Sequence, residues 1–171
     1  MRIEIGPWQV RSFRADDAEA LARNANNRNV SRNLRDHFPY PYELSDAHEW
    51  IEFVASQDTE THFAIASASE LVGAIGITLQ SDVYRRTAEI GYWLGEPHWG
   101  QGIATSALQA TTEWAFARFD LVRLYGEVFE WNPASGRVLE KAGYTLEGRL
   151  RKSILKDGQI IDALLYAIVR D

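Results

Sequence analysis

Residues 92–105, YWLGEPHWGQGIAT, decide the fold. The aromatic and apolar start of this stretch is typical of the end of a β-strand. From Ile103 to about Phe119, apolar residues recur at spacings of three and four, which predicts a helix. Gly100 and Gly102 lie in the turn between them, where glycine lets the backbone approach a ligand and turn its N–H groups outward. Because the helix adds partial positive charge there, the turn is a candidate anion site; the alternative is a tight turn that needs glycine for its geometry alone.

The spacing within the turn narrows the kinds of phosphate site. No Lys-Ser or Lys-Thr pair follows the glycines, which excludes a P-loop. Thr105 stands where a dinucleotide-binding G-x-G-x-x-G motif needs its third glycine, and the turn does not follow the first predicted strand. The turn therefore matches neither of these two phosphate-binding motifs.

The rest of the chain alternates strand and helix patterns. Strands are predicted at 8–13, 62–67, 71–80, 87–95, 122–129, 144–155 and 160–169, the last two joined by an Asp157-Gly158 hairpin turn. Helices are predicted at 16–24, at 45–56, after Gly102, and from Asn132-Pro133 to Gly143. The helix at 45–56 is expected to bury Trp50, Ile51, Phe53 and Val54. This order predicts a mixed α/β fold, with helices packed on one sheet, in a single domain of residues 1–171.

Composition excludes several classes of function. The chain has no cysteine, which rules out disulfides, Cys-ligated zinc, iron–sulfur clusters and a cysteine nucleophile. Neither a signal peptide nor a membrane-length apolar run is visible, so a cytoplasmic protein without membrane attachment is expected. Four scattered histidines show no metal-ligand spacing, so no metal is expected.

Charge is unevenly distributed along the chain. The net charge is −6, which argues against nucleic acid as a partner. Residues 1–136 carry 11 basic and 19 acidic side chains, whereas residues 137–171 carry seven and five. A basic C-terminal segment on an acidic body suits an anionic cofactor and a basic substrate, and it equally suits an ordinary surface.

A second motif, NPASGRVLEKAGY, occupies residues 132–144. Asn132 is a typical helix N-cap, and Gly143 a typical residue after a helix end. Taken alone, the motif needs no function beyond structure.

Together the two motifs resemble the GNAT superfamily of N-acetyltransferases, in the branch that includes ribosomal-protein-alanine N-acetyltransferases. The resemblance also covers the opening strand and helix and FPYPYELSDAHEWI at 38–51. The family pattern Gln/Arg-x-x-Gly-x-Gly/Ala falls on Trp99, Gly102 and Ala104, and the branch often has an aromatic residue at the Trp99 position. The resemblance implies a central mixed, mostly antiparallel sheet of about seven strands with about four helices, splayed at the cofactor site.

The resemblance also implies the ligand, acetyl-CoA, as co-substrate. Its pyrophosphate is expected on the N–H groups of the glycine turn, its pantetheine arm along the end of the preceding strand, and its thioester near the second motif. The cofactor-binding residues implied are Tyr92, Trp93, Leu94, Trp99, Gly100, Gln101, Gly102, Ile103, Ala104, Thr105, Asn132, Ser135 and Arg137.

Acetyl transfer needs a neutral amine, a stabilised oxyanion and a protonated leaving thiolate. By resemblance, Glu89 takes the amine proton, with Glu127 as second candidate, and a backbone N–H near Leu94 holds the oxyanion. The alternative for Glu89 is an exposed residue paired with Arg85 or Arg86. Many relatives carry a tyrosine as acid where this chain has Leu139, so Ser135, beside Asn132, is assigned to protonate the thiolate; a serine in a first helical turn is also commonplace structure.

The acceptor amine is expected at the variable front of the chain, in residues 33–42 together with the helix at 45–56. His37, Phe38, Tyr40 and Tyr42, with Trp131, are candidates for an aromatic pocket. Arg28, Arg32 and Arg35 either form a solvated face or hold a substrate carboxylate. The expected acceptor is a protein or peptide N-terminal α-amine, and homodimers are common among such proteins. A small amine (amino acid, polyamine or antibiotic) or a non-catalytic acetyl-CoA-binding module remains the alternative.

Overall fold

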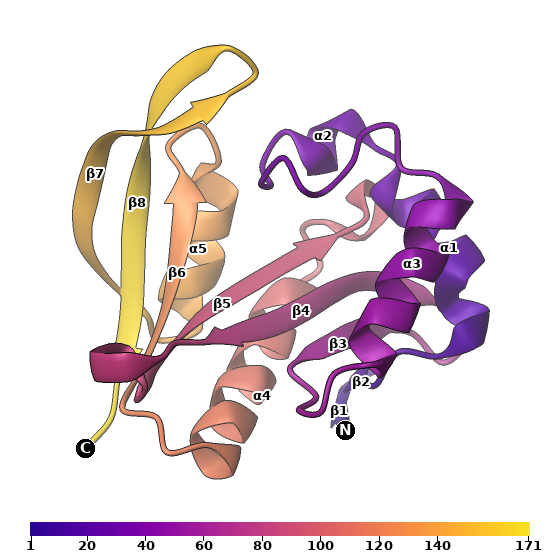
Figure 1. The fold of residues 1–171 in the computed structure, drawn as a ribbon, viewed down its shortest axis with the longest axis horizontal. Coiled ribbons are helices and arrows are strands. Elements are labelled where there is room, and N and C mark those ends of the chain that lie inside the picture. The colour runs from indigo at the N-terminus through magenta and orange to yellow at the C-terminus, as the bar shows by residue number, and fades with distance from the viewer.

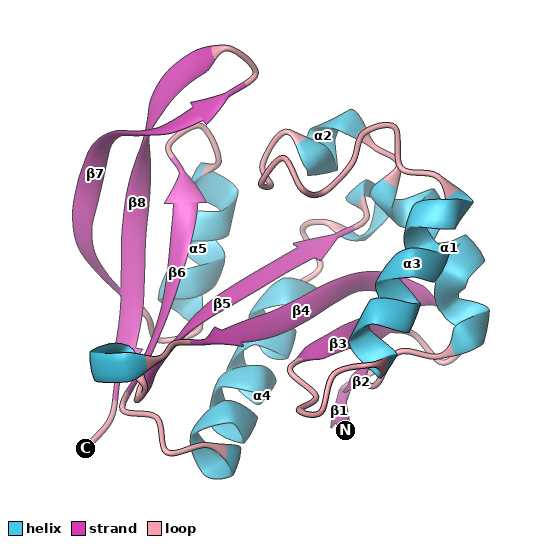
Figure 2. Cartoon of the chain, viewed as in Figure 1, coloured by secondary structure: helices cyan, strands magenta, loops and turns pink.

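A computed structural model describes residues 1–171 as one eight-stranded sheet with five α-helices (Figures 1 and 2). The strand order is β1-β2-β3-β4-β5-β6-β8-β7, and every neighbouring pair is antiparallel except β5–β6. The strands are β1 (Arg2–Ile5), β2 (Trp8–Arg11), β3 (His62–Ala66), β4 (Leu71–Leu79), β5 (Thr87–Leu94), β6 (Arg123–Phe129), β7 (Thr145–Lys156) and β8 (Gln159–Val169). The helices are α1 (Ala18–Ala25), α2 (Arg28–Ser31), α3 (Leu44–Ala55), α4 (Ile103–Arg118) and α5 (Pro133–Lys141). The mixed, mostly antiparallel sheet confirms the predicted fold class.

Two short elements exceed the expected seven strands and four helices. β1 pairs with β2 across a turn at Gly6-Pro7, and its alternating Arg2-Ile3-Glu4-Ile5 is the signal that predicts such a strand. α2 is a single turn capped by Asn27, whose side chain accepts a hydrogen bond from the Asn29 N–H. Its polar sequence has no apolar stripe, so periodicity could not find it.

The helices cover both faces of the sheet (Figure 1). α1 and α3 pack over one face of the β3–β4 region, whereas α4 packs on the opposite face and α5 packs against β6, β7 and β8. Side chains of β5 therefore alternate between two cores: Ile90 and Leu94 join the one beneath α4, and Trp93 joins the one beneath α1 and α3. The expected burial of Phe53 is wrong, since this side chain of α3 is 50% exposed.

The sheet divides at its one parallel pair. β5 and β6 pair only at Thr87–Arg123, Ala88–Leu124 and Glu89–Tyr125, and beyond these residues the two strands part (Figure 2). β5 stays paired with β4 as far as Leu94, without a bulge. The edge of β5 that faces β6 is therefore without a neighbouring strand over residues 90–94, which confirms the expected splay.

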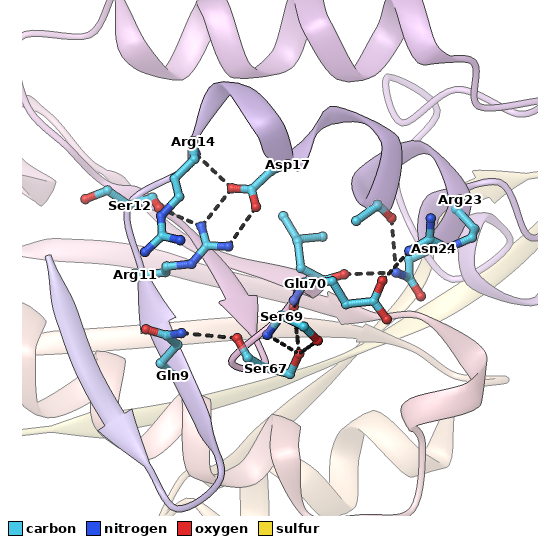
Figure 3. A network of polar contacts seen from close by, with 12 residues as sticks. Gln9, Arg11, Ser12, Arg14, Asp17, Arg23, Asn24, Ser67, Ser69 and Glu70 are labelled. Atoms are coloured by element: carbon cyan, nitrogen blue, oxygen red, sulfur yellow. Dashed lines mark hydrogen bonds and ion pairs between the residues drawn. The ribbon is translucent and has the colours of Figure 1, made fainter.

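A buried ion pair fastens β2 to the start of α1 (Figure 3). Both guanidinium NH2 groups of Arg11 donate to the carboxylate of Asp17, each at 2.7 Å, and the Arg14 N–H donates to the same carboxylate at 2.8 Å. Arg11 and Asp17 are 6% and 5% exposed, so each charge depends on the other for solvation. Farther along α1, Asn24 donates to the carbonyls of Ala20 and Leu71, which ties the helix to β4 (Figure 3).

The described structure contains no helix long and apolar enough to cross a membrane.

Candidate active site

A cavity of about 880 Å³ lies where β5 and β6 part. Its walls are residues 89–94 of β5, 126–129 of β6, the start of α4, one side of α5, and α3 with the segment before it. The cavity thus reaches from the glycine turn at the start of α4, past the open edge of β5, to the side of the sheet covered by α3.

The glycine turn adopts a conformation that favours glycine. Gly100 and Gly102 have φ values of 74° and 78°, in the left-handed region, and a Cβ at either position would meet no atom within 4 Å. A side chain at either position would therefore project into open space. The Trp99 indole N–H donates to the Leu94 carbonyl at 2.8 Å and holds the turn against the end of β5.

Backbone N–H groups at the turn lack partners within the protein. The first backbone hydrogen bond at the start of α4 runs from the Ser106 N–H to the Gly102 carbonyl, at 3.1 Å. The N–H groups of residues 100–105, which precede it, donate to no backbone or side-chain acceptor. These groups and the helix dipole form a site suited to an anion.

Glu89 lies at the point where β5 and β6 separate. Its side chain lines the cavity, is 19% exposed, and forms an ion pair with Arg35 from the segment after α2. Arg85 and Arg86, the partners that the sequence suggested, instead contact the Asp82 carbonyl and Asp120. Glu127 on the neighbouring strand is exposed and also lines the cavity.

The second motif supplies another part of the cavity wall. Asn132 is the N-cap residue of α5 and lines the cavity, but its side chain makes no capping hydrogen bond, so the expected capping bond is absent. Ser135 lies in the first turn of α5, and its hydroxyl is 2.9 Å from the hydroxyl of Tyr92 on β5. Burial raises the pKa of Tyr92 to about 12, while its bond to Ser135 opposes the shift.

Comparison with known proteins gives the family. Residues 9–145 match the acetyltransferase (GNAT) domain. The chain belongs to the GNAT acetyltransferase family. This finding confirms the family resemblance that rests on the glycine turn and the second motif.

Relatives of this GNAT chain include ribosomal-protein acetyltransferases. Probable N-acetyltransferase YjcK of Bacillus subtilis is 37% identical over 115 residues, 66% of this chain and 64% of that protein. Ribosomal-protein-serine acetyltransferase of Escherichia coli is 37% identical over 109 residues, 64% of this chain and 60% of that protein. The chain therefore spans about three fifths of the length of these curated relatives. The structure of Mycobacterium smegmatis RimJ in complex with CoA-disulfide is similar with a TM-score of 0.84 at 27% identity, covering 98% of this chain and 84% of that one.

The cavity of the GNAT chain gathers nearly all residues that the sequence assigned to a cofactor. Those lining it are Tyr92, Trp93, Leu94, Trp99, Gly100, Gly102, Ile103, Ala104, Thr105, Asn132, Ser135 and Arg137. Gln101 is outside this lining, and its side chain donates to the Pro97 carbonyl at 3.1 Å. Lys141 also lines the cavity and was missed, although it lies one helical turn after Arg137 and so on the same side of α5.

On the acceptor side, the cavity lining matches the predicted residues less well than on the cofactor side. His37, Phe38 and Tyr42 line the cavity, and Phe38 packs on Trp93 with ring centroids 5.4 Å apart. Tyr40 and Trp131 are not in the lining; Arg28 stacks over Tyr40 and Arg32 over Trp131.

Residues of α3 and β3 complete the acceptor side. The sequence predicted that the helix at 45–56 contributes to this side, although it assigned Trp50 and Phe53 to the buried stripe and left out His62. The additional lining residues there include Asp46, Glu49, Trp50, Phe53 and His62. Trp50 packs on Phe53 and His62, at centroid distances of 5.6 and 5.3 Å. Burial lowers the pKa of His62, which favours the neutral ring. Phe53 is half exposed because its side chain faces the cavity and not the core, and this exposure marks α3 as part of the acceptor side.

Proposed function

We propose that this protein is an acetyl-CoA-dependent N-acetyltransferase, with residues 1–171 acting as one domain, that transfers acetyl directly to a primary amine at a protein or peptide N-terminus. The observation that carries the proposal is the cavity at the parted strands, which joins the unpartnered N–H groups of the glycine turn to Glu89. Family membership and the CoA-bound relative support the same ligand.

The residues present fit an extended, polyanionic thioester. Phosphates would meet the N–H groups of residues 100–105, with Arg137 and Lys141 adding positive charge from α5. The pantetheine amides would bond the edge of β5 that β6 leaves free, as an added strand would. The thioester would then lie near Ser135, where α5 begins.

Chemistry at the thioester needs few groups. Glu89, directly or through water, would take the proton from the attacking amine. A backbone N–H near Leu94 would stabilise the oxyanion, and Ser135 would donate to the leaving sulfur. Transfer is direct because the chain has no cysteine to carry the acetyl group.

A second acceptor class, a small polyamine, has one observation in its favour. Trp50 and Phe53 present aromatic faces on the acceptor side, and Asp46 and Glu49 lie beside them. Aromatic faces and carboxylates together attract cations. The α-amine of a peptide remains the main proposal because the ribosomal-protein-serine acetyltransferase is 37% identical to this chain, whereas a spermidine N(1)-acetyltransferase of Escherichia coli is 26% identical.

The test measures acetyl-CoA binding by calorimetry and then CoA release with N-terminal peptides, amino acids and polyamines. The proposal expects binding, with turnover on peptides; turnover on polyamines alone would select the second class. Binding without turnover on any amine would indicate a non-catalytic binding module, and absence of binding would refute the whole proposal.

Glu89→Gln tests the base. The variant should lose activity most at low pH, where the amine is protonated and needs a proton acceptor, and recover as pH rises. Glu127→Gln is the matched control, because Glu127 lines the same cavity from the neighbouring strand. An unchanged pH profile in Glu89→Gln would remove Glu89 from this role, and a changed profile in Glu127→Gln would transfer the role to that residue.

A further inference from the structure

The hydroxyl of Tyr92 is bonded to the start of α5. It lies 2.9 Å from the Ser135 hydroxyl and donates to the Ser135 carbonyl at 3.1 Å. Tyr92 and Ser135 come from the two sides of the cavity, 43 residues apart in the chain, and both line it. The bond therefore connects β5 to the residue placed next to the thioester.

The number of protons limits what this pair can do. A phenol has one proton to donate, and a serine hydroxyl has one proton and two acceptor sites. If Tyr92 donates to the serine hydroxyl, the serine's own proton is free to be donated elsewhere, including into the cavity. If Tyr92 donates only to the carbonyl, the serine proton can be donated back to the phenol oxygen and is lost to the cavity.

The surroundings keep Tyr92 protonated, so its hydroxyl retains the one proton that it can donate. Burial raises its pKa to about 12, and its titratable neighbours Tyr144 and Tyr166 also have pKa values raised by burial. A phenol with this pKa holds its proton in the presence of a thiolate, since thiols ionise near pH 8.5. Tyr92 is thus unsuited to transfer its proton to sulfur and well suited to direct the proton of its neighbour.

We propose that Tyr92 is a positioning residue, which shares its proton between the carbonyl and the hydroxyl of Ser135 and thereby leaves the serine O–H free to donate a hydrogen bond to the sulfur of the departing CoA thiolate. The inference rests on the proposed function. As the carbon–sulfur bond of the tetrahedral intermediate breaks, the sulfur keeps the electron pair and accepts a hydrogen bond from Ser135. The proton that converts thiolate to thiol comes from solvent, so Ser135 and Tyr92 end the cycle in their original protonation states.

The thiol of bound CoA provides a test that needs no turnover. The fraction of thiolate in the protein–CoA complex is followed by its ultraviolet absorbance as pH is raised. A hydrogen bond donated to the thiolate should lower the thiol pKa by about one unit in the wild type relative to Ser135→Ala, because bonds to charged groups stabilise by about this amount. In Tyr92→Phe the thiol pKa should rise most of the way to its value in Ser135→Ala. In Ser135→Thr, which keeps a hydroxyl, the thiol pKa should stay near the wild-type value.

Turnover separates positioning from support of the fold. Tyr92→Phe should lower kcat about tenfold with little change in the Kd for acetyl-CoA, and it should add little to the loss in Ser135→Ala, since both changes break one chain of hydrogen bonds. Tyr144→Phe is the matched control: it removes another buried tyrosine hydroxyl, bonded at 2.7 Å to Thr112, away from the cavity lining.

Two outcomes would overturn the inference. Equal thiol pKa values in the wild type and both single variants would show that the sulfur receives no bond from Ser135. Additive losses in the double variant, or a Kd that rises as kcat falls, would show that Tyr92 only supports α5. Failure of the wild type to bind CoA would instead refute the proposed function.

Discussion

Glycine at position 102 can serve either the left-handed backbone of the turn or the approach of a ligand to its N–H groups. Replacing Gly102 by alanine separates these two reasons. Gly102 is the N-cap residue of α4 and has a φ of 78°, and a Cβ there would meet no protein atom within 4 Å. Alanine therefore causes backbone strain without a clash. A left-handed alanine costs about 1 kcal/mol in the free energy of unfolding, which lowers the melting temperature by about 2–4 °C for a chain of this size.

The chain offers a control with the same strain. Gly158, in the turn between β7 and β8, has a φ of 73° and also has no atom within 4 Å of its Cβ position, but it is not in the cavity lining. Gly158→Ala should lower the melting temperature by the same amount and leave acetyl-CoA binding unchanged.

Only Gly102→Ala should weaken the binding of acetyl-CoA. Its methyl group would occupy the open side of the turn and displace phosphates from the free N–H groups. Loss of one hydrogen bond to a charged group raises Kd by roughly 10- to 100-fold. The measurements are thermal unfolding and calorimetric titration with acetyl-CoA. Equal Kd values for Gly102→Ala and Gly158→Ala would refute the assignment of this turn to the phosphates, since strain alone would then account for the glycine.

Three further outcomes are expected. Asp17→Ala leaves Arg11 charged and buried, so it should lower the free energy of unfolding by about 3–5 kcal/mol in a urea titration, and a loss below about 1 kcal/mol would contradict the mutual solvation of the pair. His62 has its pKa lowered by folding, so the unfolded chain binds more protons and stability falls as pH drops below about 6.5; His62→Gln should flatten this part of the pH dependence of the melting temperature, and an equal slope in both proteins would contradict it. Phe53→Ala should leave stability within about 0.5 kcal/mol because the side chain is half exposed, yet raise KM for the acceptor with the acetyl-CoA Kd unchanged; equal acceptor KM values would place the acceptor elsewhere.

Local patterns predicted most of the fold because they report local physics. The Asp157-Gly158 turn adopts left-handed φ values of 51° and 73°, as a two-residue hairpin turn requires. The helix expected after Gly102 begins at Ile103 and buries Ala107, Leu108 and Ala115. In both cases the residues that carry the signal contact neighbours within a few positions, or face one continuous core.

The features of the site that the sequence did not predict depend on contacts between residues far apart in the chain. Phe53 has the spacing of a core residue, but the cavity beside α3 leaves it without cover. The family resemblance assigned Tyr92 to the cofactor, whereas its bond to Ser135 depends on how α5 lies against β5. Glu89 lies on the predicted strand, but its ion-pair partner Arg35 is 54 residues away in the chain, and no local pattern could identify that partner.

That partner belongs to residues 27–36, a polar segment that contacts three parts of the cavity rim. Arg35 pairs with Glu89, and Asp36 accepts from Lys156 near the β7–β8 turn at 2.7 Å. Asn27 donates to Glu96, in the turn before α4, at 2.6 Å. One segment therefore contacts the proposed base, the hairpin across the cavity and the approach to the glycine turn.

This arrangement has a consequence for how acceptors are selected. The segment leads directly into His37 and Phe38, which line the acceptor side, so the residues expected to contact an amine are adjacent in the chain to the residue paired with Glu89. A change of sequence that reshapes the acceptor side must also move Arg35, and with it the carboxylate proposed to accept the amine proton. Acceptor preference and the position of the base are therefore coupled through the backbone, and exchanging single aromatic residues should alter acceptor affinity more easily than it transfers full activity to a new amine.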